Sequence, residues 1–295
     1  MGPAQRILVT GGTGFLGSYI VAELLARGDR VAVLKRAASP LGRLEASAQR
    51  LHFYATDETG VERAFSEQGG FDAVVHAATC YGRLQEAATE VFSANLAFPL
   101  RVLEAAVRFG TSAFLNLDTA LPRRQDAYVL SKKQFAERGQ EVAGRTGIRF
   151  VNIELQHMYG PGDDESKFTT WVIRSCRRNE PELRLTAAEQ KRDFVYVEDV
   201  VSACRKLLQK APEDTRTFQR YPVGSGQAVR VREYVELAHR MTHSRTRLVF
   251  GAVPYREDEV MYCQADLTAM RTLGWRPRFS LQDGIQHILQ AESES

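Results

Sequence analysis

The sequence predicts an α/β protein with a doubly wound parallel sheet and a smaller mixed α/β lobe toward the C-terminus. In the first half, short β-branched runs alternate with helical segments, which indicates right-handed βαβ crossovers with helices on both faces of the sheet. After Tyr159 the segments become shorter and mixed in type. We expect this second part to be partly interleaved with the sheet and to close over its C-terminal edge.

The elements of the first half follow from the hydrophobic pattern, taken in order. Short apolar runs predict strands at 6–10, 31–34, 51–54, 72–76, 112–117 and 148–153. Helical spacing predicts a first helix that ends near Gly28, followed by helices at about 60–68, 86–108 and 126–145.

The second half contains fewer and shorter expected strands, near 183–186 and 192–197. The expected helices lie at about 166–178, from 197 to about 210, and at about 230–242, 266–273 and 280–291. Together the elements assign residues 1–160 to a first domain, to which 193–225 returns. Residues 161–192 and 226–295 form the smaller lobe.

Composition excludes several classes of protein. A chain of 295 residues suits one large domain with a lobe, or two domains, because a domain averages about 150 residues. Hydrophobic residues make up 44% and charged residues 25%, which is ordinary for a soluble globular protein. The formal charge, 39 − 36 = +3, is too small and too dispersed to indicate binding to nucleic acid.

The spacing of the cysteines and the length of the apolar runs predict the cellular compartment of the protein. The four cysteines are Cys80, Cys176, Cys204 and Cys263. They form no C-x-x-C pair and share no spacing with the histidines, so we expect reduced thiols in a cytoplasmic protein, and no metal site. No run of about 18 apolar residues occurs, and the start M-G-P-A-Q-R lacks an apolar signal core, so we expect no contact with a membrane.

A glycine triplet joins the first strand to the first helix: Gly11, Gly14 and Gly17 in T-G-G-T-G-F-L-G. Such glycines permit a tight turn, let backbone N–H groups approach a pyrophosphate, and let the helix pack close to the strand. The helix N-terminus adds partial positive charge. A plain tight turn is the alternative. The context of strand, triplet and helix predicts a dinucleotide site of the Rossmann type, with Thr13, Phe15 and Leu16 also contacting the cofactor.

The end of the second strand indicates which dinucleotide is bound. Proteins that bind NAD usually have an acid there for the adenosine ribose, whereas this chain has Lys35-Arg36, which suits a 2′-phosphate. We therefore expect NADPH; a solvated basic loop is the alternative. Asp57 follows the third strand and is a candidate acceptor for the adenine amino group or, equally, an N-cap of the next helix.

Tyr128 and Lys132 in Y-V-L-S-K lie at i and i+4, on one face of an expected helix. A nearby ammonium stabilises a tyrosinate and lowers the tyrosine pKa, and it can also hold the nicotinamide ribose hydroxyls. Thr119 ends the preceding strand, where its hydroxyl is placed to bond a substrate carbonyl. The alternative for Thr119 is a local hydrogen bond to the backbone of a turn.

These motifs occur together with several others along the chain: V-V-H-A-A (74–78), S-A-N-L-A-F-P-L (93–100), Y-G-P-G (159–162), R-D-F-V-Y-V-E-D-V (192–200) and L-G-W-R-P (273–277). In this combination the chain resembles the extended short-chain dehydrogenase/reductases of the NAD(P)-dependent sugar epimerase/dehydratase family, over nearly its whole length.

The resemblance implies a role for each matching residue. Tyr128 would be the general acid/base, Lys132 its partner and Thr119 the hydroxyl that orients the carbonyl. Asn95 would support the site, or alternatively bond the backbone within its helix. His76 and Ala77 would line the cofactor.

The resemblance also implies a nucleotide-sugar substrate. The residues expected to contact it are Tyr81, His157, Lys167, Arg192 and Arg256. Guanidinium groups fork two hydrogen bonds onto phosphate oxygens, so the arginines suit a diphosphate. Surface salt bridges are the alternative for the cations, and simple packing is the alternative for His157, where many relatives have Asn.

Departures from the family pattern narrow the range of reactions that we expect. No acidic pair follows Thr119, which disfavours dehydration, and Lys35-Arg36 suits NADPH that enters, reacts and leaves. The nine residues from Thr119 to Tyr128 make the connecting loop 121–127 shorter than usual. The segments 131–135, 157–168 and 189–203 resemble the sugar-nucleotide 4-ketoreductases that make CDP-abequose or CDP-paratose from a CDP-4-keto-3,6-dideoxyhexose.

We therefore expect an NADPH-dependent reductase of the C4 ketone of a nucleotide-activated deoxyhexose. Three alternatives stay open: a C4 epimerase with bound NAD, a non-catalytic sensor of NADP(H), and a reductase of a ketone without a nucleotide. The resemblance also implies a homodimer through the helices near 86–108 and 126–145. The sequence leaves the nucleotide base and the C4 configuration open.

Overall fold

The computed structural model describes residues 4–123, 126–210 and 216–293. The chain divides into two compact units. Unit 1 comprises Met1–Glu154 and Val201–Tyr221, and unit 2 comprises Leu155–Val200 and Pro222–Ser295. The segment that returns to unit 1 is therefore Val201–Tyr221.

The core of unit 1 is a seven-stranded sheet with the order β10-β6-β5-β4-β1-β2-β3. The strands are β1 Arg6–Thr10, β2 Arg30–Leu34, β3 Leu51–Tyr54, β4 Ala73–His76, β5 Ala113–Thr119, β6 Arg149–Leu155 and β10 Phe218–Val223. Strand β1 pairs in parallel with β2 and β4, β2 pairs with β3, and β4 pairs with β5. The predicted doubly wound parallel sheet is confirmed; the edge strand β10 was not predicted.

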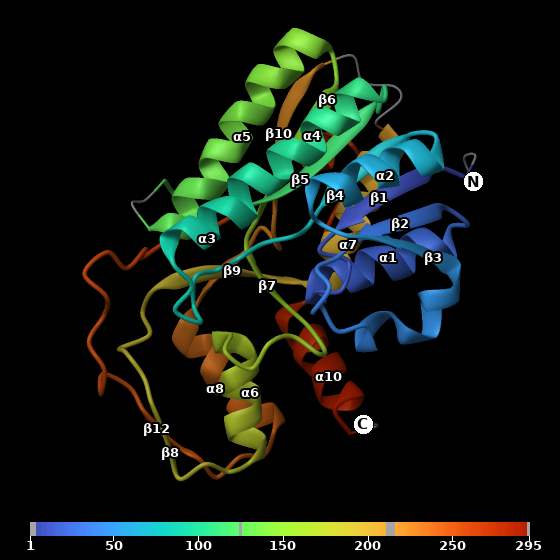
Figure 1. Ribbon diagram of the computed structural model, residues 1–295. Coiled ribbons are helices and arrows are strands. Elements are labelled where there is room, and N and C mark those ends of the chain that lie inside the picture. Colours follow the sequence, from blue (N-terminus) through green and yellow to red (C-terminus); the bar gives the residue numbers. More distant parts are fainter. Residues whose placement is uncertain (1–3, 124–125, 211–215, 294–295) are drawn as a thin grey trace. The chain divides into compact units, whose positions relative to one another are not determined.

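Helices cover both faces of this sheet (Figure 1). One face carries α2 (Glu58–Gln68), α4 (Phe98–Arg108) and α5 (Ala127–Thr146). The other carries α1 (Phe15–Ala26) and α7 (Val197–Lys210), which an ion pair of 3.1 Å between Glu23 and Arg205 joins. Shorter elements complete the unit: the 3₁₀ helix Gly42–Arg50, α3 Ala88–Phe92 and the π-helical turn Ser93–Ala97.

Local sequence explains where the helices begin and end. Asp57 caps α2 by accepting a hydrogen bond from the backbone N–H of Gly60, and Asp126 caps α5 by accepting one from Val129. Gly28 follows α1 with a φ of 87°, a left-handed conformation that glycine adopts without strain. The predicted helix end near Gly28 is confirmed.

Aromatic packing fixes α5 against the sheet. The rings of Phe114 on β5 and Phe150 on β6 stack at 5.5 Å, and Phe135 of α5 meets both edge-on. Gly139 lets the helix come this close, because a Cβ there would lie 2.2 Å from the Cζ atom of Phe150. The position of the side chains on α5 is therefore set by a rigid core.

Unit 2 is a smaller mixed α/β unit, as the sequence predicts. Its three-stranded sheet consists of β7 His157–Tyr159, β9 Lys191–Tyr196 and β11 Ala228–Arg230, with β7 parallel and β11 antiparallel to β9. A second pair is formed by β8 Glu182–Arg184 and β12 Arg247–Val249. The helices are α6 Phe168–Arg177, α8 Val231–Met241, α9 Thr268–Thr272 and α10 Leu281–Ala291.

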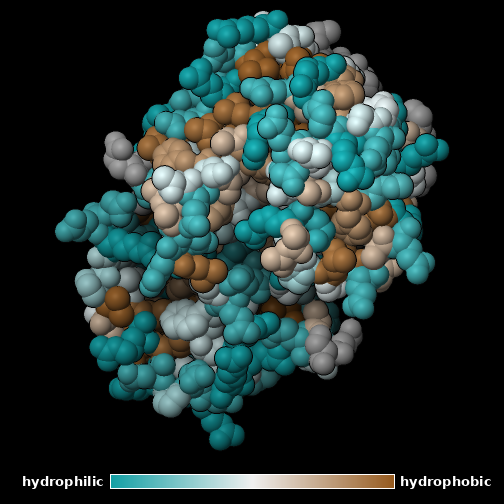
Figure 2. All heavy atoms as spheres, viewed as in Figure 1, coloured by the Kyte–Doolittle hydropathy of each residue, from teal (hydrophilic) through white to brown (hydrophobic). Residues whose placement is uncertain are grey.

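Hydrophilic side chains cover most of the face shown in Figure 2. Within the described ranges, no helix is both long and apolar enough to cross a membrane. Over the same residues, no group of three or more His, Cys, Asp or Glu side chains is placed to hold a metal ion. All four cysteines are free thiols.

Candidate active site

The loop between β1 and α1 is a cradle of backbone. Gly11 has a φ of 69°, and its carbonyl accepts a hydrogen bond of 3.0 Å from the N–H of Gly14. A Cβ at Gly11 would lie 2.5 Å from the backbone nitrogen of Ala78, and one at Gly17 would lie 2.0 Å from the oxygen of Gly11. The three predicted glycines thus meet at one turn, where Gly11 and Gly17 leave no room for a side chain, which fits close approach by a pyrophosphate.

The residues around this cradle come from neighbouring strand ends. Ala77 donates its N–H to the carbonyl of Thr10, at 3.1 Å, and so lies beside the glycine turn. His76 is fully buried, and its Nδ1 atom lies 2.7 Å from the Thr10 hydroxyl. Burial first, and the charge of Lys132 second, hold the pKa of His76 well below its usual range. A neutral His76 thus lies beside the strand end that leads into the glycine turn, and its place in the wall of a cofactor site stays a prediction.

Two cations follow β2. The backbone N–H of Lys35 bonds the carbonyl of Tyr54, while its ammonium is 3.4 Å from the carbonyl of Ala37. Arg36 is exposed. Asp57, after β3, serves as the N-cap of α2, with 2.7 Å between its carboxylate and the N–H of Gly60. The structure therefore shows the capping role of Asp57, and its contact with adenine stays a prediction.

Lys132 lies one helical turn after Tyr128 on α5 and is 2% exposed. Its ammonium has no hydrogen-bond partner among the residues that the structure describes. Burial lowers the pKa of Lys132 to about 8; Asp118 opposes this shift and Lys133 adds to it. A buried donor without a partner is costly, and it fits an ammonium that bonds a ligand such as the ribose hydroxyls of a dinucleotide.

The phenol of Tyr128 lies between β5 and a loop that follows β4. Burial raises the pKa of Tyr128 well above its usual value, Tyr81 and Asp118 raise it further, and a hydrogen bond with the Thr119 side chain lowers it. The expectation that Lys132 brings this pKa down is therefore wrong for this structure, because desolvation dominates. The ring of Tyr81 lies 5.0 Å from that of Tyr128, between centroids.

Thr119 is the last residue of β5 and is buried. Its Oγ1 atom contacts the Tyr128 hydroxyl and also accepts a hydrogen bond of 3.2 Å from the N–H of Leu121. The local hydrogen bond to the backbone is thus present, and the bond of Thr119 to a substrate carbonyl stays a prediction. Of the connecting loop 121–127, residues 124 and 125 lie outside the described residues.

Asn95 lies on the π-helical turn Ser93–Ala97 and is fully buried. Its amide donates to the carbonyl of Cys80 and to the hydroxyl of Ser131, at 2.8 and 3.2 Å, and accepts from the N–H of Cys80 at 2.8 Å. Asn95 therefore ties the loop after β4 to α5, near Tyr128. Such turns, with one extra residue, are frequent at functional sites.

Sequence reasoning missed a polar group behind Thr119. The carboxylate of Asp118 accepts hydrogen bonds of 3.0 Å from both Lys133 and Asn152. Asn116 in turn donates to Asn152, at 2.7 Å. The only signals in the sequence were the acid before Thr119 and the second lysine of S-K-K, and neither has a spacing that predicts contact.

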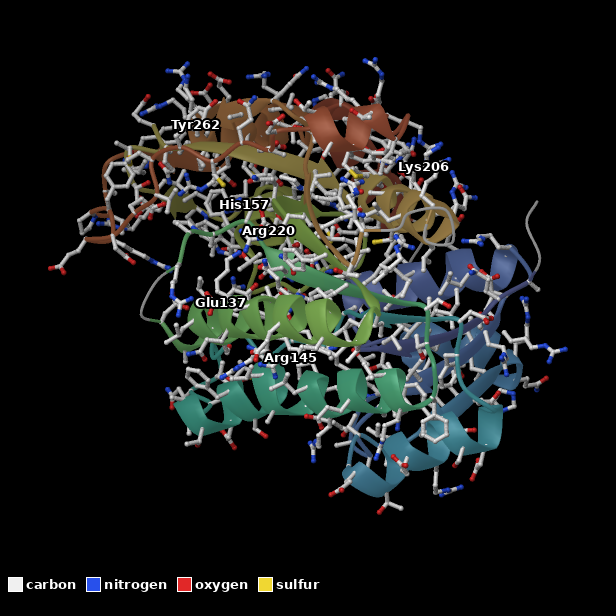
Figure 3. All side chains as sticks on the ribbon, turned by 90° about the horizontal axis from the view of Figure 1, so that it is seen from above. Glu137, Arg145, His157, Lys206, Arg220 and Tyr262 are labelled. Atoms are coloured by element: carbon white, nitrogen blue, oxygen red, sulfur yellow. The ribbon has the colours of Figure 1, made fainter. Side chains whose placement is uncertain are left out.

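Two of the four predicted substrate residues of unit 2 are in ion pairs within the unit. The ammonium of Lys167 lies 3.0 Å from the carboxylate of Asp163, and the Arg192 guanidinium pairs with Glu259. The ring of His157, labelled in Figure 3, lies 6.1 Å from that of Phe194, so it packs within unit 2. Arg256 is exposed. Tyr81, the remaining predicted contact, lies in unit 1 on Tyr128.

The unit 1 residues thus form one constellation: a glycine turn, an ammonium with no partner in the described part of the chain, and a phenol bonded to a threonine at the carboxyl end of a parallel strand. Residues 7–224 match the NAD dependent epimerase/dehydratase family. The chain belongs to this family. A member from Salmonella muenchen, a CDP-abequose synthase, is 30% identical over 292 residues, which cover 97% of both chains.

Solved structures of family members share the fold over almost their whole length. The UDP-glucose 4-epimerase of Thermotoga maritima, solved with UDP-glucose, superposes with a TM-score of 0.86 at 24% identity and covers 98% of this chain and 99% of its own. The UDP-glucose 4-epimerase of Thermus thermophilus, in complex with NAD, gives 0.85 at 25% identity with the same coverage. The protein is thus an enzyme of a family that uses nicotinamide cofactors on nucleotide sugars.

Proposed function

We propose that this protein is an NADPH-dependent ketoreductase that reduces the C4 ketone of a nucleotide-activated, CDP-linked 4-keto-deoxyhexose. The observation that carries the proposal is the full-length similarity to CDP-abequose synthase, at 30% identity over 97% of both chains. The site residues support it, since the Tyr128, Lys132 and Thr119 set needed for carbonyl chemistry is complete.

The chain provides proton transfer and orientation for such a reduction. A bound nicotinamide dinucleotide supplies the hydride. Thr119 holds the C4 carbonyl oxygen through its hydroxyl, and Tyr128 donates its phenolic proton to that oxygen as negative charge develops on it. Because burial raises the pKa of Tyr128, the phenol is protonated at neutral pH, which is the form that a reduction consumes.

The remaining site residues bind and orient the cofactor. Lys132 holds the nicotinamide ribose with its unpartnered ammonium. The glycine turn and the N-terminus of α1 receive the pyrophosphate. Lys35 and Arg36 supply two positive charges for a 2′-phosphate, which supports NADPH over NADH.

The cations of unit 2 support the proposal that the substrate is anionic. In this proposal Arg192, Arg256 and Lys167 bind the diphosphate, and Tyr81 and His157 contact the sugar or nucleotide. Because Arg192 and Lys167 are paired with carboxylates, binding would exchange an internal ion pair for one with phosphate. A homodimer through the helices near 86–108 and 126–145, and a cytoplasmic location, stay predictions.

A C4 epimerase is the second candidate, and the structural similarity to two UDP-glucose 4-epimerases favours it. An epimerase must first oxidise its substrate, which requires a tyrosinate as base. A tightly retained NAD and no net consumption of cofactor would mark this activity.

The test is consumption of NADPH, followed by its absorbance, with a panel of CDP-, TDP-, UDP- and GDP-4-keto-deoxysugars and with NADH in parallel. The proposal expects oxidation of NADPH with the CDP-linked ketone and a much slower rate with NADH. Interconversion of C4 epimers without net oxidation would establish the epimerase instead. Tight binding of NADPH with no reaction on any ketone of the panel would overturn the ketoreductase.

A further inference from the structure

A buried ion pair lies directly behind the threonine of the site. Lys133 of α5 and Asp118 of β5 are 3.0 Å apart, and their side chains are 17% and 0% exposed. Asn152 of β6 donates to the same carboxylate oxygen as Lys133. The pair therefore joins the helix that carries Tyr128 to the strand that ends in Thr119.

The pair holds both polar groups of the Thr119 backbone. One carboxylate oxygen of Asp118 accepts from the N–H of Thr119 at 2.7 Å, and the Lys133 ammonium donates to its carbonyl. These side chains act where β5 extends beyond β4, since the pairing of β4 with β5 ends at His76 and Asn116. Buried backbone groups need partners, and here two charged side chains supply them.

The two adjacent lysines of α5 have separate tasks. Lys132 has no hydrogen-bond partner in the described part of the chain, whereas Lys133 has two, both at the end of β5. Desolvating an ion pair costs more than a neutral packing contact of the same size, so stability alone is a weak reason to bury one. A requirement for fixed geometry is a stronger reason, because the Thr119 hydroxyl touches the reacting phenol.

We infer that Lys133 and Asp118 are positioning residues that fix the backbone of Thr119, so that its hydroxyl meets both the Tyr128 phenol and the substrate carbonyl oxygen. The inference rests on the proposed ketoreductase function. Lys133 touches neither substrate nor cofactor in it and acts only through Thr119. A displacement of about 1 Å at such a hydroxyl can lower a rate by ~10²-fold.

A double-mutant cycle tests this dependence. Lys133→Met is expected to lower kcat by ~10²-fold while leaving the KM for NADPH unchanged, whereas Lys133→Arg, which keeps the charge, retains most of the rate. In a Thr119→Ala background, Lys133→Met should cause no further loss, because the hydroxyl that it positions is gone. The inference would be overturned if the losses in kcat of the two single variants multiplied in the double variant. A Lys133→Met enzyme with full kcat would also overturn it.

Arg145→Met is the matched control. Arg145 lies in the last turn of the same helix, is labelled in Figure 3, is 76% exposed and pairs with Glu141. This variant removes one cation from α5 without touching Thr119, so its kcat should equal that of the wild type.

Amide hydrogen exchange at Thr119 and Leu121 provides a readout that needs no substrate. Without Lys133 we expect exchange at these amides to quicken by about tenfold, and with Lys133→Arg to stay slow. If the wild type reduces none of the panel, the proposed function fails, and exchange alone decides the positioning role. Unchanged exchange in Lys133→Met would overturn it whatever the enzyme reduces.

Discussion

One predicted ligand-binding cation of unit 1 and two of unit 2 lie in opposite surroundings. In unit 1, Lys132 is buried without a partner among the described residues. In unit 2, Lys167 and Arg192 each lie against a carboxylate. If the proposed roles hold, Lys132 is ready for its ligand at a cost in stability, whereas a ligand of Lys167 or Arg192 must replace an internal partner.

The largest effect is expected when the proton donor of unit 1 is removed. Tyr128→Phe removes the only proton donor assigned to the reaction, so kcat should fall by ~10³-fold or more. Binding of NADPH, measured by fluorescence titration, should change less than about twofold, because the assigned cofactor contacts lie elsewhere. A Tyr128→Phe enzyme with wild-type turnover would contradict the assignment.

Lys132→Met should separate activity from stability. Activity should fall by ~10²-fold, while unfolding by urea at pH 7 should show a gain of about 3 kcal/mol, the equivalent of a pKa lowered from 10.5 to about 8. The sign follows because the unfolded chain binds the proton more tightly. The contribution of Lys132 to wild-type stability is therefore most unfavourable below pH 8, and this penalty disappears toward pH 10.5.

The gain in Lys132→Met should accordingly shrink as the pH increases through that range. In the wild type, kcat/KM should fall above about pH 8, as the Lys132 ammonium loses its proton. A variant that is less stable than the wild type at pH 7 would show that Lys132 has a partner in solution.

Arg192→Met tests one of the paired cations of unit 2. Glu259 would lose its partner, so we expect a loss of about 3 kcal/mol, near the low end for broken buried pairs because Glu259 is 21% exposed. Affinity for CDP, measured by calorimetry, should also fall. Arg178→Met is the control, since its 3.8 Å pair with Glu165 is mostly exposed. Unchanged CDP affinity would remove Arg192 from the substrate site.

The smallest effects test whether packing makes unit 1 rigid. Gly139→Ala drives a methyl group into Phe150 and should cost about 1–3 kcal/mol and lower kcat, by shifting α5. Gly144→Ala, on the same helix with nothing within 4 Å, should instead raise stability by about 0.5–1 kcal/mol with kcat unchanged. Equal effects of the two substitutions would show that α5 tolerates displacement.

The sequence predicted the parts of the site that depend on local pattern. The glycine turn follows from spacing next to a strand, and Tyr128 and Lys132 share a face because helices place i and i+4 together. Most helix bounds fell within two residues because apolar periodicity and caps mark them. The parallel sheet followed from the alternation of strands and helices.

The features that the sequence did not predict depend on pairing between distant residues. Asp118 and Lys133 meet only because helix α5 packs back on β5, and Arg192 meets Glu259 across 67 residues. The three-residue strands β7, β11 and β12 carry too few residues for a period. Nor does any residue type mark the π turn at Asn95, because apolar spacing cannot distinguish it from a regular helix.

Because of this π-helical turn, the site depends on the number of residues between Ala88 and Arg108. The π-helical turn Ser93–Ala97 contains one residue more than an α-helical turn needs. Deleting one residue there would let the segment from Ala88 to Arg108 become a regular helix, but it would rotate the residues before the deletion by about 100° relative to those after it. Asn95 could then no longer reach both Cys80 and Ser131. A substitution in this turn alters packing locally, whereas a single deletion would disconnect the loop that carries Tyr81 from the helix that carries Tyr128.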